Sequence, residues 1–253
     1  MFIDDFYFYL TAVPAVLIYG MAKGGLGGAA GAVAVPLMSL TTEPIQAAAI
    51  LLPIIFVMDI HVIKLFWGKF DAGSLKIIVP AALLGVVIGA LLLGVLPTSG
   101  IKLLLGVIAV VFCIDFWTRR ARQQPRSEPG PWSGRFWAVI AGITSTHIHA
   151  GGPAISVYLL AKSLDKIILV GTFGVFFFVL NFAKLIPYTL LGQFDAQNLM
   201  TALLLLPLAP VGVRLGYLFL HRFDQAKIYT FIYGLLFLTG IKLLVDGLGL
   251  VAA

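Results

Sequence analysis

Charged residues are scarce in this chain of 253 residues. Asp, Glu, Lys and Arg together make up 11% of it, whereas soluble globular domains carry about 25%. Hydrophobic residues make up 60%, and the stretch 77–96 contains no charged residue at all. A membrane helix needs about 20 mostly apolar residues. The composition therefore excludes an ordinary soluble domain and predicts an all-α, polytopic protein whose main solvent is the lipid bilayer.

Cysteine is almost absent, which excludes several kinds of site. The single cysteine, Cys113, lies in an apolar run, so no internal disulfide, cysteine-based metal site or redox pair can form. The formal net charge is +6, but 5 of the 17 basic residues lie between Arg119 and Arg135. Basic loops of that kind are typical of membrane topology. We therefore expect the bilayer as a partner, and no nucleic acid.

Hydrophobic runs between polar breaks predict eight membrane spans. Their approximate ranges are 6–40, 44–66, 75–96, 100–117, 135–161, 166–191, 196–220 and 226–248. The N-terminus lacks the basic region and cleavage site of a secretory signal, so we expect the first run to remain in the mature protein.

A polar linker, 118–134, divides the chain into a first repeat, 1–117, and a second repeat, 135–253. Lysines also follow the second span, so we expect that loop and the linker to be cytoplasmic. Eight crossings would place both termini in the cytoplasm and make the repeats parallel. The run 6–40 is long for one crossing, however, and a re-entrant hairpin there would invert the count.

The two halves share residues at a nearly constant spacing. Gly20 aligns with Gly142 and Asp59 with Asn181, both at an offset of 122 (142 − 20, 181 − 59). After a two-residue insertion, 68–72 aligns with 192–196 at an offset of 124 (192 − 68). This pattern favours an internal duplication, which is common in transporters because two similar bundles can move around a site at their interface.

Six glycines fall between positions 20 and 31, inside an apolar segment, and should interrupt the helix. Inside a bilayer such a break is tolerated where the backbone is buried in protein or lines a wet cavity. Freed N–H groups and a helix N-terminus there would suit an anion. The candidate anion-binding glycines are Gly24, Gly25, Gly27, Gly28 and Gly31. The alternative is that these glycines serve close helix packing. A dinucleotide-binding loop is disfavoured, because it requires a strand before the stretch, a βαβ unit around it and an acidic residue later.

Polar side chains replace much of the glycine in the second half. The candidates there are Thr144, Ser145, Thr146, His147, His149, Gly151 and Gly152. Their hydroxyl and imidazole groups could surround one oxyanion at the depth where the first half offers backbone N–H groups. The alternatives are histidines that serve packing alone, or histidines that bind a metal, although no cysteine or carboxylate lies close by in sequence to complete a tetrahedral set.

Charged residues within spans are costly and usually face a cavity or a partner. Lys23 adjoins the glycine-rich break, and we expect its head to reach the membrane interface rather than the substrate. Asp59 pairs with Lys64 or, alternatively, carries a coupled proton near His61.

Three further residues are site candidates. Asn181 needs hydrogen-bond partners, and its alignment with Asp59 suggests related places near a symmetry axis. Arg214 suits an oxyanion, with snorkelling to the interface as the alternative. Lys184 joins Lys23 and Asp59 as a candidate for ion coupling.

Several of these patterns together resemble the sulfite exporter TauE/SafE family. They are 24–28 leading into Val35-Pro36-Leu37, the turns 68–71 and 192–195, and Gly151-Gly152-Pro153. The resemblance implies a bacterial inner-membrane permease that moves sulfite, sulfoacetate or a related sulfur-containing anion, often outward. The chain differs from the family in the polar run 144–149, where a more glycine-rich run is usual.

We therefore expect a multi-pass transporter of a small sulfur-containing anion that works by alternating access of the two repeats. We expect no cofactor, no resident metal and no catalytic residue. A homo-oligomer is compatible with the sequence. The rival function is transport of a transition-metal cation by His147, His149 and Asp59. An intramembrane enzyme is disfavoured, because Ser145 and its neighbouring histidines have no evident partner acid.

Overall fold

The computed structural model describes residues 2–26, 30–92, 97–121 and 128–249, and every regular element in them is a helix. In chain order the α-helices are α1 (Phe6–Met21), α2 (Ala34–Met38), α3 (Pro44–Leu65), α4 (Ala72–Leu91), α5 (Thr98–Ala121), α6 (Pro131–Ile148), α7 (Gly151–Ala161), α8 (Lys166–Leu190), α9 (Ala196–Leu205), α10 (Leu208–Arg222) and α11 (Gln225–Gly247). A π-helical turn, Ala22–Leu26, extends α1, and a 3-10 turn, Ala30–Val33, precedes α2. The predicted all-α class is confirmed.

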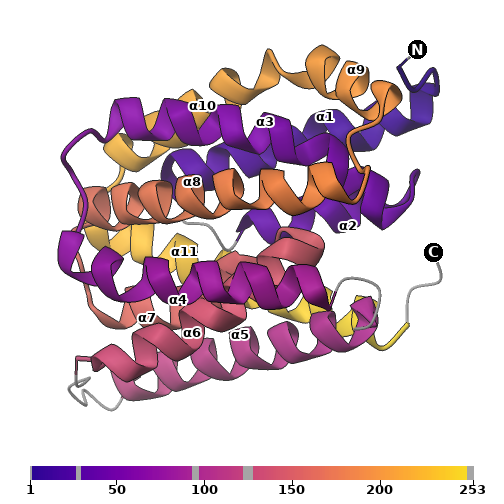
Figure 1. The fold of residues 1–253 in the computed structure, drawn as a ribbon. Helices are drawn as coiled ribbons and strands as arrows, with labels where there is room; N and C mark the ends of the chain where they lie inside the picture. Colours follow the sequence, from indigo (N-terminus) through magenta and orange to yellow (C-terminus); the bar gives the residue numbers. More distant parts are fainter. Residues whose placement is uncertain (1, 27–29, 93–96, 122–127, 250–253) are drawn as a thin grey trace.

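The first hydrophobic run is a hairpin rather than one crossing. The chain goes in along α1 and comes back along α2, so that both arms end on the same side (Figure 1). At the open end, the Thr11 and Thr41 hydroxyls lie 2.8 Å apart. Near the tip, a Cβ atom on Gly31 would lie 3.1 Å from the Tyr19 ring, so the arms pack without a side chain between them.

The second half opens with a hairpin of the same kind, formed by α6 and α7. His149 ends α6 in the left-handed conformation (φ 52°), and Gly151 begins α7 two residues later. The arms pack closely, since a Cβ on Gly151 would lie 2.7 Å from Ala141 O and one on Gly134 would lie 2.8 Å from the Tyr158 ring. Both predicted helix breaks are therefore present in the structure.

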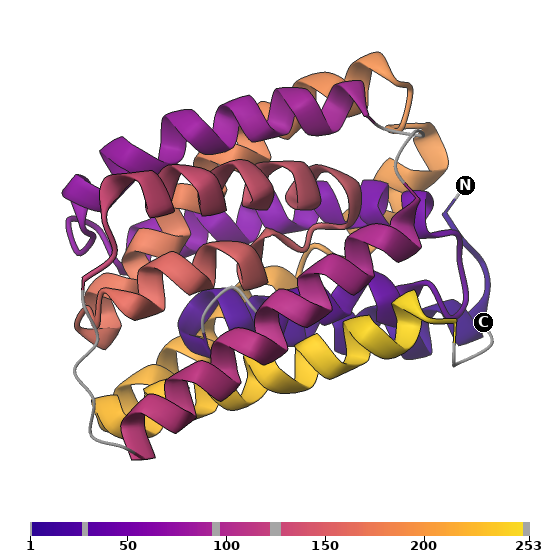
Figure 2. The same cartoon turned by 90° about the horizontal axis from the view of Figure 1, so that it is seen from below.

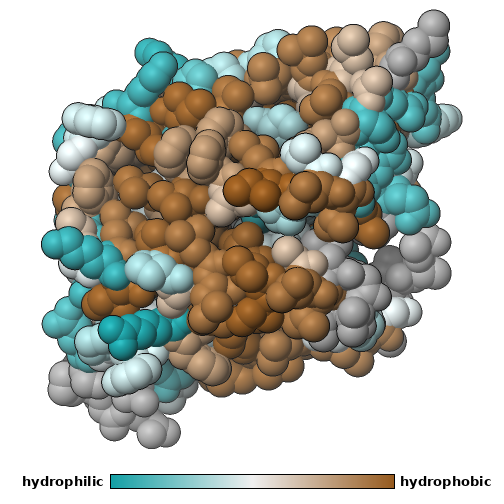
Figure 3. All heavy atoms as spheres, viewed as in Figure 1, coloured by the Kyte–Doolittle hydropathy of each residue, from teal (hydrophilic) through white to brown (hydrophobic). Residues whose placement is uncertain are grey.

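Long helices follow each hairpin and cross the molecule side by side (Figures 1 and 2). Apolar side chains form a belt over their middle parts, with polar groups at the two ends of the bundle (Figure 3). Within the described residues, five helices are by length and composition able to cross a membrane, and one of them is the hairpin arm α1 with its π-helical turn. A sixth is added if α9 and α10, bent by 44°, make one span. The class of multi-pass membrane protein is thus supported, whereas the count of eight spans is not confirmed.

The two halves run in opposite directions through the bundle. The hairpin α1–α2 opens at the end where α11 finishes, which we call the terminal end, and the hairpin α6–α7 opens at the opposite end, which we call the linker end (Figure 1). Helices α3 and α8, which occupy corresponding places in the two halves, pack antiparallel, with Gly171 near Phe66 and Gly174 near Val62. The arrangement is therefore inverted, and the expectation of parallel repeats was wrong. Its cause is the hairpin, which removes one crossing from each half.

The aligned turns 68–71 and 192–195 have one physical explanation. Gly68 and Gly192 adopt positive φ angles of 72° and 66°, which glycine reaches without strain. Three residues later, Asp71 and Asp195 act as N-caps: each carboxylate accepts a hydrogen bond from a backbone N–H in the first turn of α4 or α9. The shared motif thus ends one helix and starts the next.

Basic residues gather at the linker end. The described basic residues of loops and helix ends there are Lys64, Lys69, Lys76, Arg135, Lys162, Lys166, Arg222 and Lys227, whereas Lys102 and Lys242 lie toward the terminal end. Cytoplasmic loops are enriched in Lys and Arg. By this criterion the linker end faces the cytoplasm, which stays a prediction. Helix α1 begins and α11 ends at the opposite end, because each half lacks one crossing. The linker and the two ends of the chain therefore cannot all be cytoplasmic, as eight crossings would require.

We predict that single cysteines placed at the two ends will differ in accessibility. In intact cells, a membrane-impermeant maleimide should label Asp5→Cys, which lies at the terminal end. It should label Glu128→Cys, which lies near the linker, only after the membrane is opened. The native Cys113 is buried and provides the unlabelled background. Equal labelling of the two variants in intact cells, whether both react or neither does, would contradict the inverted arrangement.

Glycines set the distance between the most closely packed helices. A Cβ on Gly85 would lie 2.2 Å from Val139 O, and one on Gly142 would lie 2.2 Å from Ala82 O, across the α4–α6 contact. On the other side of the bundle, a Cβ on Gly20 would lie 2.8 Å from Gly212 Cα, across the α1–α10 contact. Small residues allow such backbone approach in membranes, where van der Waals packing holds helices together.

We predict that Gly85→Ala and Gly142→Ala will each destabilise the protein by about 1–3 kcal/mol, because the new methyl group meets backbone that cannot move alone. The measurement is thermal unfolding in detergent. Gly234→Ala is the matched control: its Cβ would meet no atom within 4 Å. It should leave stability unchanged or raise it by up to about 1 kcal/mol. Equal effects at all three positions would contradict this account.

Candidate functional site

The two helix breaks lie against each other in the interior of the bundle. Tyr19, in the last turn of α1, donates a hydrogen bond to His149 O at the tip of the second hairpin, at 3.4 Å. The same tyrosine ring packs against Gly31 of the first hairpin. Tyr19 and His149 are both buried. The tips of the two hairpins therefore form one region, and the polar groups described below surround it.

An ion pair and an amide join the halves at this place. Lys23, in the π-helical turn, donates to Asp59 Oδ1 of α3. Asn181 of α8 donates to Asp59 Oδ2 at 2.6 Å. All three side chains are buried, and both carboxylate oxygens are in use. Asp59 and Asn181, aligned by the internal repeat, thus touch each other directly.

Lys184 lies one turn after Asn181 on α8 and belongs to the same buried region. Its Nζ lies 2.9 Å from Ser145 Oγ, 3.1 Å from Ser145 O and 2.8 Å from His149 Nδ1. Lys184 is completely buried. With Lys23 and Asp59, it gives the region two basic side chains and one acidic side chain. We call the set Lys23, Asp59, Ser145, His149, Asn181 and Lys184 the central network.

The contacts of His149 define its tautomer. Nε2 lies 2.9 Å from Ala48 O on α3, and because a carbonyl oxygen can only accept, Nε2 carries the hydrogen. Nδ1 is then the acceptor for Lys184 in the neutral ring. Tyr188, one turn beyond Lys184, packs near the ring at 6.0 Å between centroids and donates to Thr146 O at 2.9 Å. The left-handed backbone of His149 thus aims its side chain into the space between α3 and α8.

Several predicted site residues make other contacts. The Thr144 hydroxyl donates to Ile140 O at 2.8 Å and the Thr146 hydroxyl to Gly142 O at 2.9 Å, both within α6. His147 lies only partly buried, with Nδ1 3.0 Å from Ile143 O and Nε2 3.4 Å from Leu92 O at the end of α4. His147 and His149 therefore face different neighbours, because the chain reverses direction between them.

Other expectations change as well. Lys23 is buried against Asp59, so the expectation that it reaches the interface was wrong. Asp59 does not pair with Lys64, because the two lie more than a helical turn apart and Asp59 faces inward. Arg214 is exposed on the outer face of α10, away from the central network, in agreement with the snorkelling alternative.

The glycines of the first break divide into three groups. A Cβ on Gly24 would lie 2.1 Å from Val213 O and one on Gly25 would lie 2.0 Å from Gly216 O, so both serve packing against α10. Gly31 packs on Tyr19. Gly27 and Gly28 lie outside the described residues. In the second break, Gly151 and Gly152 form the buried first turn of α7, which has no side-chain cap.

Tyr19, Ala48 and Tyr188 complete the surroundings of the central network, and the sequence did not identify them as site residues. Ala48 contributes a carbonyl group that any residue would supply. The two tyrosines lie in apolar runs, where an aromatic residue usually indicates packing. The sequence signal that could have identified Tyr188 is its position one helical turn after Lys184, a lysine within a span.

Metal-ion binding finds no support among the described residues. They contain no group of three or more His, Cys, Asp or Glu side chains close enough to share an ion. Asp59 faces Lys23, and His149 faces Lys184, so a cation would meet a lysine at either place. The arrangement is suited to a guest of negative charge.

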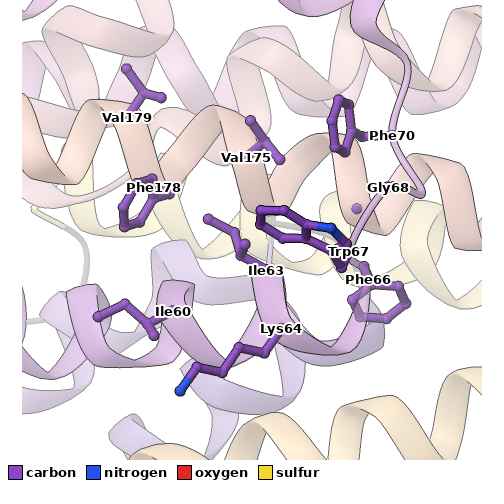
Figure 4. A pocket seen from close by; sticks show the side chains of 11 residues that line it. Ile60, Ile63, Lys64, Phe66, Trp67, Gly68, Phe70, Val175, Phe178 and Val179 are labelled. Atoms are coloured by element: carbon purple, nitrogen blue, oxygen red, sulfur yellow. The ribbon is translucent and has the colours of Figure 1, made fainter.

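A separate hollow lies on the outside of α3 and α8, near the linker end (Figure 4). It has a volume of about 670 Å³. The sticks in Figure 4 show Ile63, Val175 and Phe178 around it, with Trp67 across its end and Lys64 at its edge. Such an apolar lining suits lipid chains and has few groups that could hold a small anion. The central network is therefore the better candidate site.

Comparison with known proteins agrees with the site and the fold. Searches of curated protein sequences and of solved structures gave no significant match. The sequence profile described as "Sulfite exporter TauE/SafE" matches residues 12–243, nearly the whole chain, including both helix breaks and every residue of the central network. Its members are membrane transporters of sulfur-containing anions rather than enzymes. The chain therefore belongs to the sulfite exporter TauE/SafE family.

Proposed function

We propose that the protein carries a small sulfur-containing anion, such as sulfite or an organosulfonate, across the bacterial inner membrane, and that the anion binds at the central network. One observation carries the proposal: two buried lysines and one buried aspartate lie where the two helix breaks meet. Fully charged, these three side chains sum to +1, and a buried charge of that sign is stabilised by an anion.

The start of α7 supports the same location. Its first turn, Gly151 and Gly152, is buried and has no side-chain cap, so backbone N–H groups and the positive end of the helix dipole face the region of the breaks. Sulfite and sulfonate oxygens accept several hydrogen bonds each. Backbone N–H groups, the Ser145 hydroxyl and a lysine ammonium together match those needs.

Alternating access is the mechanism that the inverted arrangement favours. Related halves of opposite direction can exchange conformations, so that a site between them opens first to one side and then to the other. In this chain the contact between Asp59 and Asn181 lies between the halves, and each hairpin opens at a different end. We infer export from the cytoplasm, in line with the family.

The test is transport by the purified protein in proteoliposomes. Sulfite, sulfoacetate and thiosulfate are offered separately, with chloride and phosphate as reference anions. We expect saturable uptake of at least one of the sulfur compounds. If the native protein neither moves nor binds any of the three, the proposed function is wrong.

We predict that His149→Ala will reduce transport far more than His147→Ala. His149→Ala removes the acceptor of Lys184 and the donor to Ala48 O, and unsatisfied buried groups cost about 1–3 kcal/mol, or roughly 5- to 150-fold. His147 bonds only to backbone outside the central network, so its substitution should change transport by less than about threefold.

The two histidines make a matched pair, because they lie two residues apart in the same polar run. Thermal unfolding of both variants in detergent checks that each one folds. Similar losses of transport in two folded variants would argue against a site at the central network.

A further inference from the structure

Lys184 is a buried amine whose partners are neutral acceptors. Its Nζ contacts Ser145 O, Ser145 Oγ and His149 Nδ1. Within the described part of the chain, no carboxylate lies at ion-pair distance from it, and the nearby Asp59 has both oxygens occupied by Lys23 and Asn181. A charged ammonium in such a place is destabilised until an anion approaches.

The contacts of Lys184 suit both of its protonation states. As an ammonium, it donates three hydrogen bonds to three acceptors. As an amine, it donates to Ser145 O and His149 Nδ1, while its lone pair accepts the hydrogen of the Ser145 hydroxyl. Ser145 Oγ can take either role because its hydrogen rotates, whereas the carbonyl can only accept. One proton can therefore enter or leave without breaking the hydrogen-bond set.

The other titratable groups around Lys184 lack this freedom. Lys23 and Asp59 close an ion pair, and neutralising either one leaves the other charge buried alone. The hydroxyls of Tyr19 and Tyr188 each donate to a backbone carbonyl of the α6–α7 hairpin. His149 Nε2 donates to Ala48 O, and a proton added at Nδ1 would face the Lys184 ammonium, so the ring stays neutral when Lys184 is charged.

Helices α4 and α11 also pack against α8. The buried face of α4 carries no titratable side chain. The buried titratable side chain of α11 is Tyr233, whose ring stacks on Phe112 and Phe116 of α5. Among the titratable groups named here, Lys184 is therefore the one whose hydrogen-bond partners accommodate both the charged and the neutral form.

We propose that Lys184 binds the transported anion directly and takes up one proton with each anion bound. This inference rests on the proposed function and specifies its coupling ion. The amine nitrogen accepts a proton from water on the side from which the anion enters, forming one N–H bond. An N–H group then turns from Ser145 to an oxygen atom of the anion. When the anion leaves, the proton returns to water on the other side. A monoanion thus crosses together with one proton and no net charge.

The experiment counts protons during binding to the native protein. Isothermal titration calorimetry in detergent uses sulfoacetate and thiosulfate, whose own charges do not change near neutral pH. Each is titrated in buffers that differ in enthalpy of ionisation. We expect the measured enthalpy to follow the buffer with a slope of about one proton taken up per anion. Binding with the same enthalpy in every buffer would overturn the inference and leave the proposed function intact. Absence of binding by both anions would overturn the inference, and the proposed function falls with it only if sulfite is also neither moved nor bound in the proteoliposome test.

Two variants identify the residue. Arginine stays protonated, so Lys184→Arg should still bind the anion and should take up no proton. Lys184→Met should weaken binding about 30-fold or more, because the buried cation is lost. An uptake of about one proton by folded Lys184→Arg would show that another group titrates.

Lys166→Gln is the matched control. Lys166 also has backbone carbonyl partners, Leu220 O and Phe223 O, but it lies at the start of α8, outside the central network. The variant should keep the affinity and the proton count of the native protein. A proton count that falls in this control as well would argue against an assignment to Lys184. Thermal unfolding verifies the fold of each variant.

Discussion

The contact between Asp59 and Asn181 is the interaction around which the interior is organised. It joins α3 to α8 across the middle of the bundle, where a carboxylate would be costly without partners. Lys23 and Asn181 supply those partners, one from each half. The hairpin of the first half is thereby held to a helix of the second. The close glycine contacts of α1 with α10 and of α4 with α6 then fix the distances on either side.

Much of the fold could be predicted from the sequence because membrane helices have a strong compositional signal. The apolar runs and both helix breaks lie where the sequence indicated. The predicted linker 118–134 differs at both ends, because α5 continues to Ala121 and α6 begins at Pro131, and residues 122–127 lie outside the described part of the chain. The predicted count of eight spans is not confirmed, and the reason lies in the two hairpins. The length of 6–40 pointed to a re-entrant hairpin as an alternative to one crossing, but 135–161 is close in length to a single span. The hairpin of the second half was therefore not predicted. A single reversal in each half changes parallel repeats into inverted ones.

The site was predictable in part. Asp59, Asn181 and Lys184 stood out because polar residues in spans need partners, and the alignment of Asp59 with Asn181 placed them near a common axis. The partner of Asp59 was not predictable, since Lys64 lies close in sequence and Lys23 lies close only after folding. The polar run 144–149 was predicted to surround one oxyanion as a group, and it does not for a similar reason. The left-handed turn at His149 ends the helix, so His147 and His149 face different sides.

Asp59 and Asn181 occupy aligned positions of the two halves and touch each other, and this imposes an evolutionary constraint. If a gene duplication or a dimer of identical subunits gave rise to this architecture, the same residue once stood on both sides of the 2.6 Å contact now made by Asp59 and Asn181. Two aspartates there would repel each other, and two asparagines would leave Lys23 without a counter-charge. Fusion into one chain lets the two positions differ, so an asymmetric pair can form that identical subunits cannot provide.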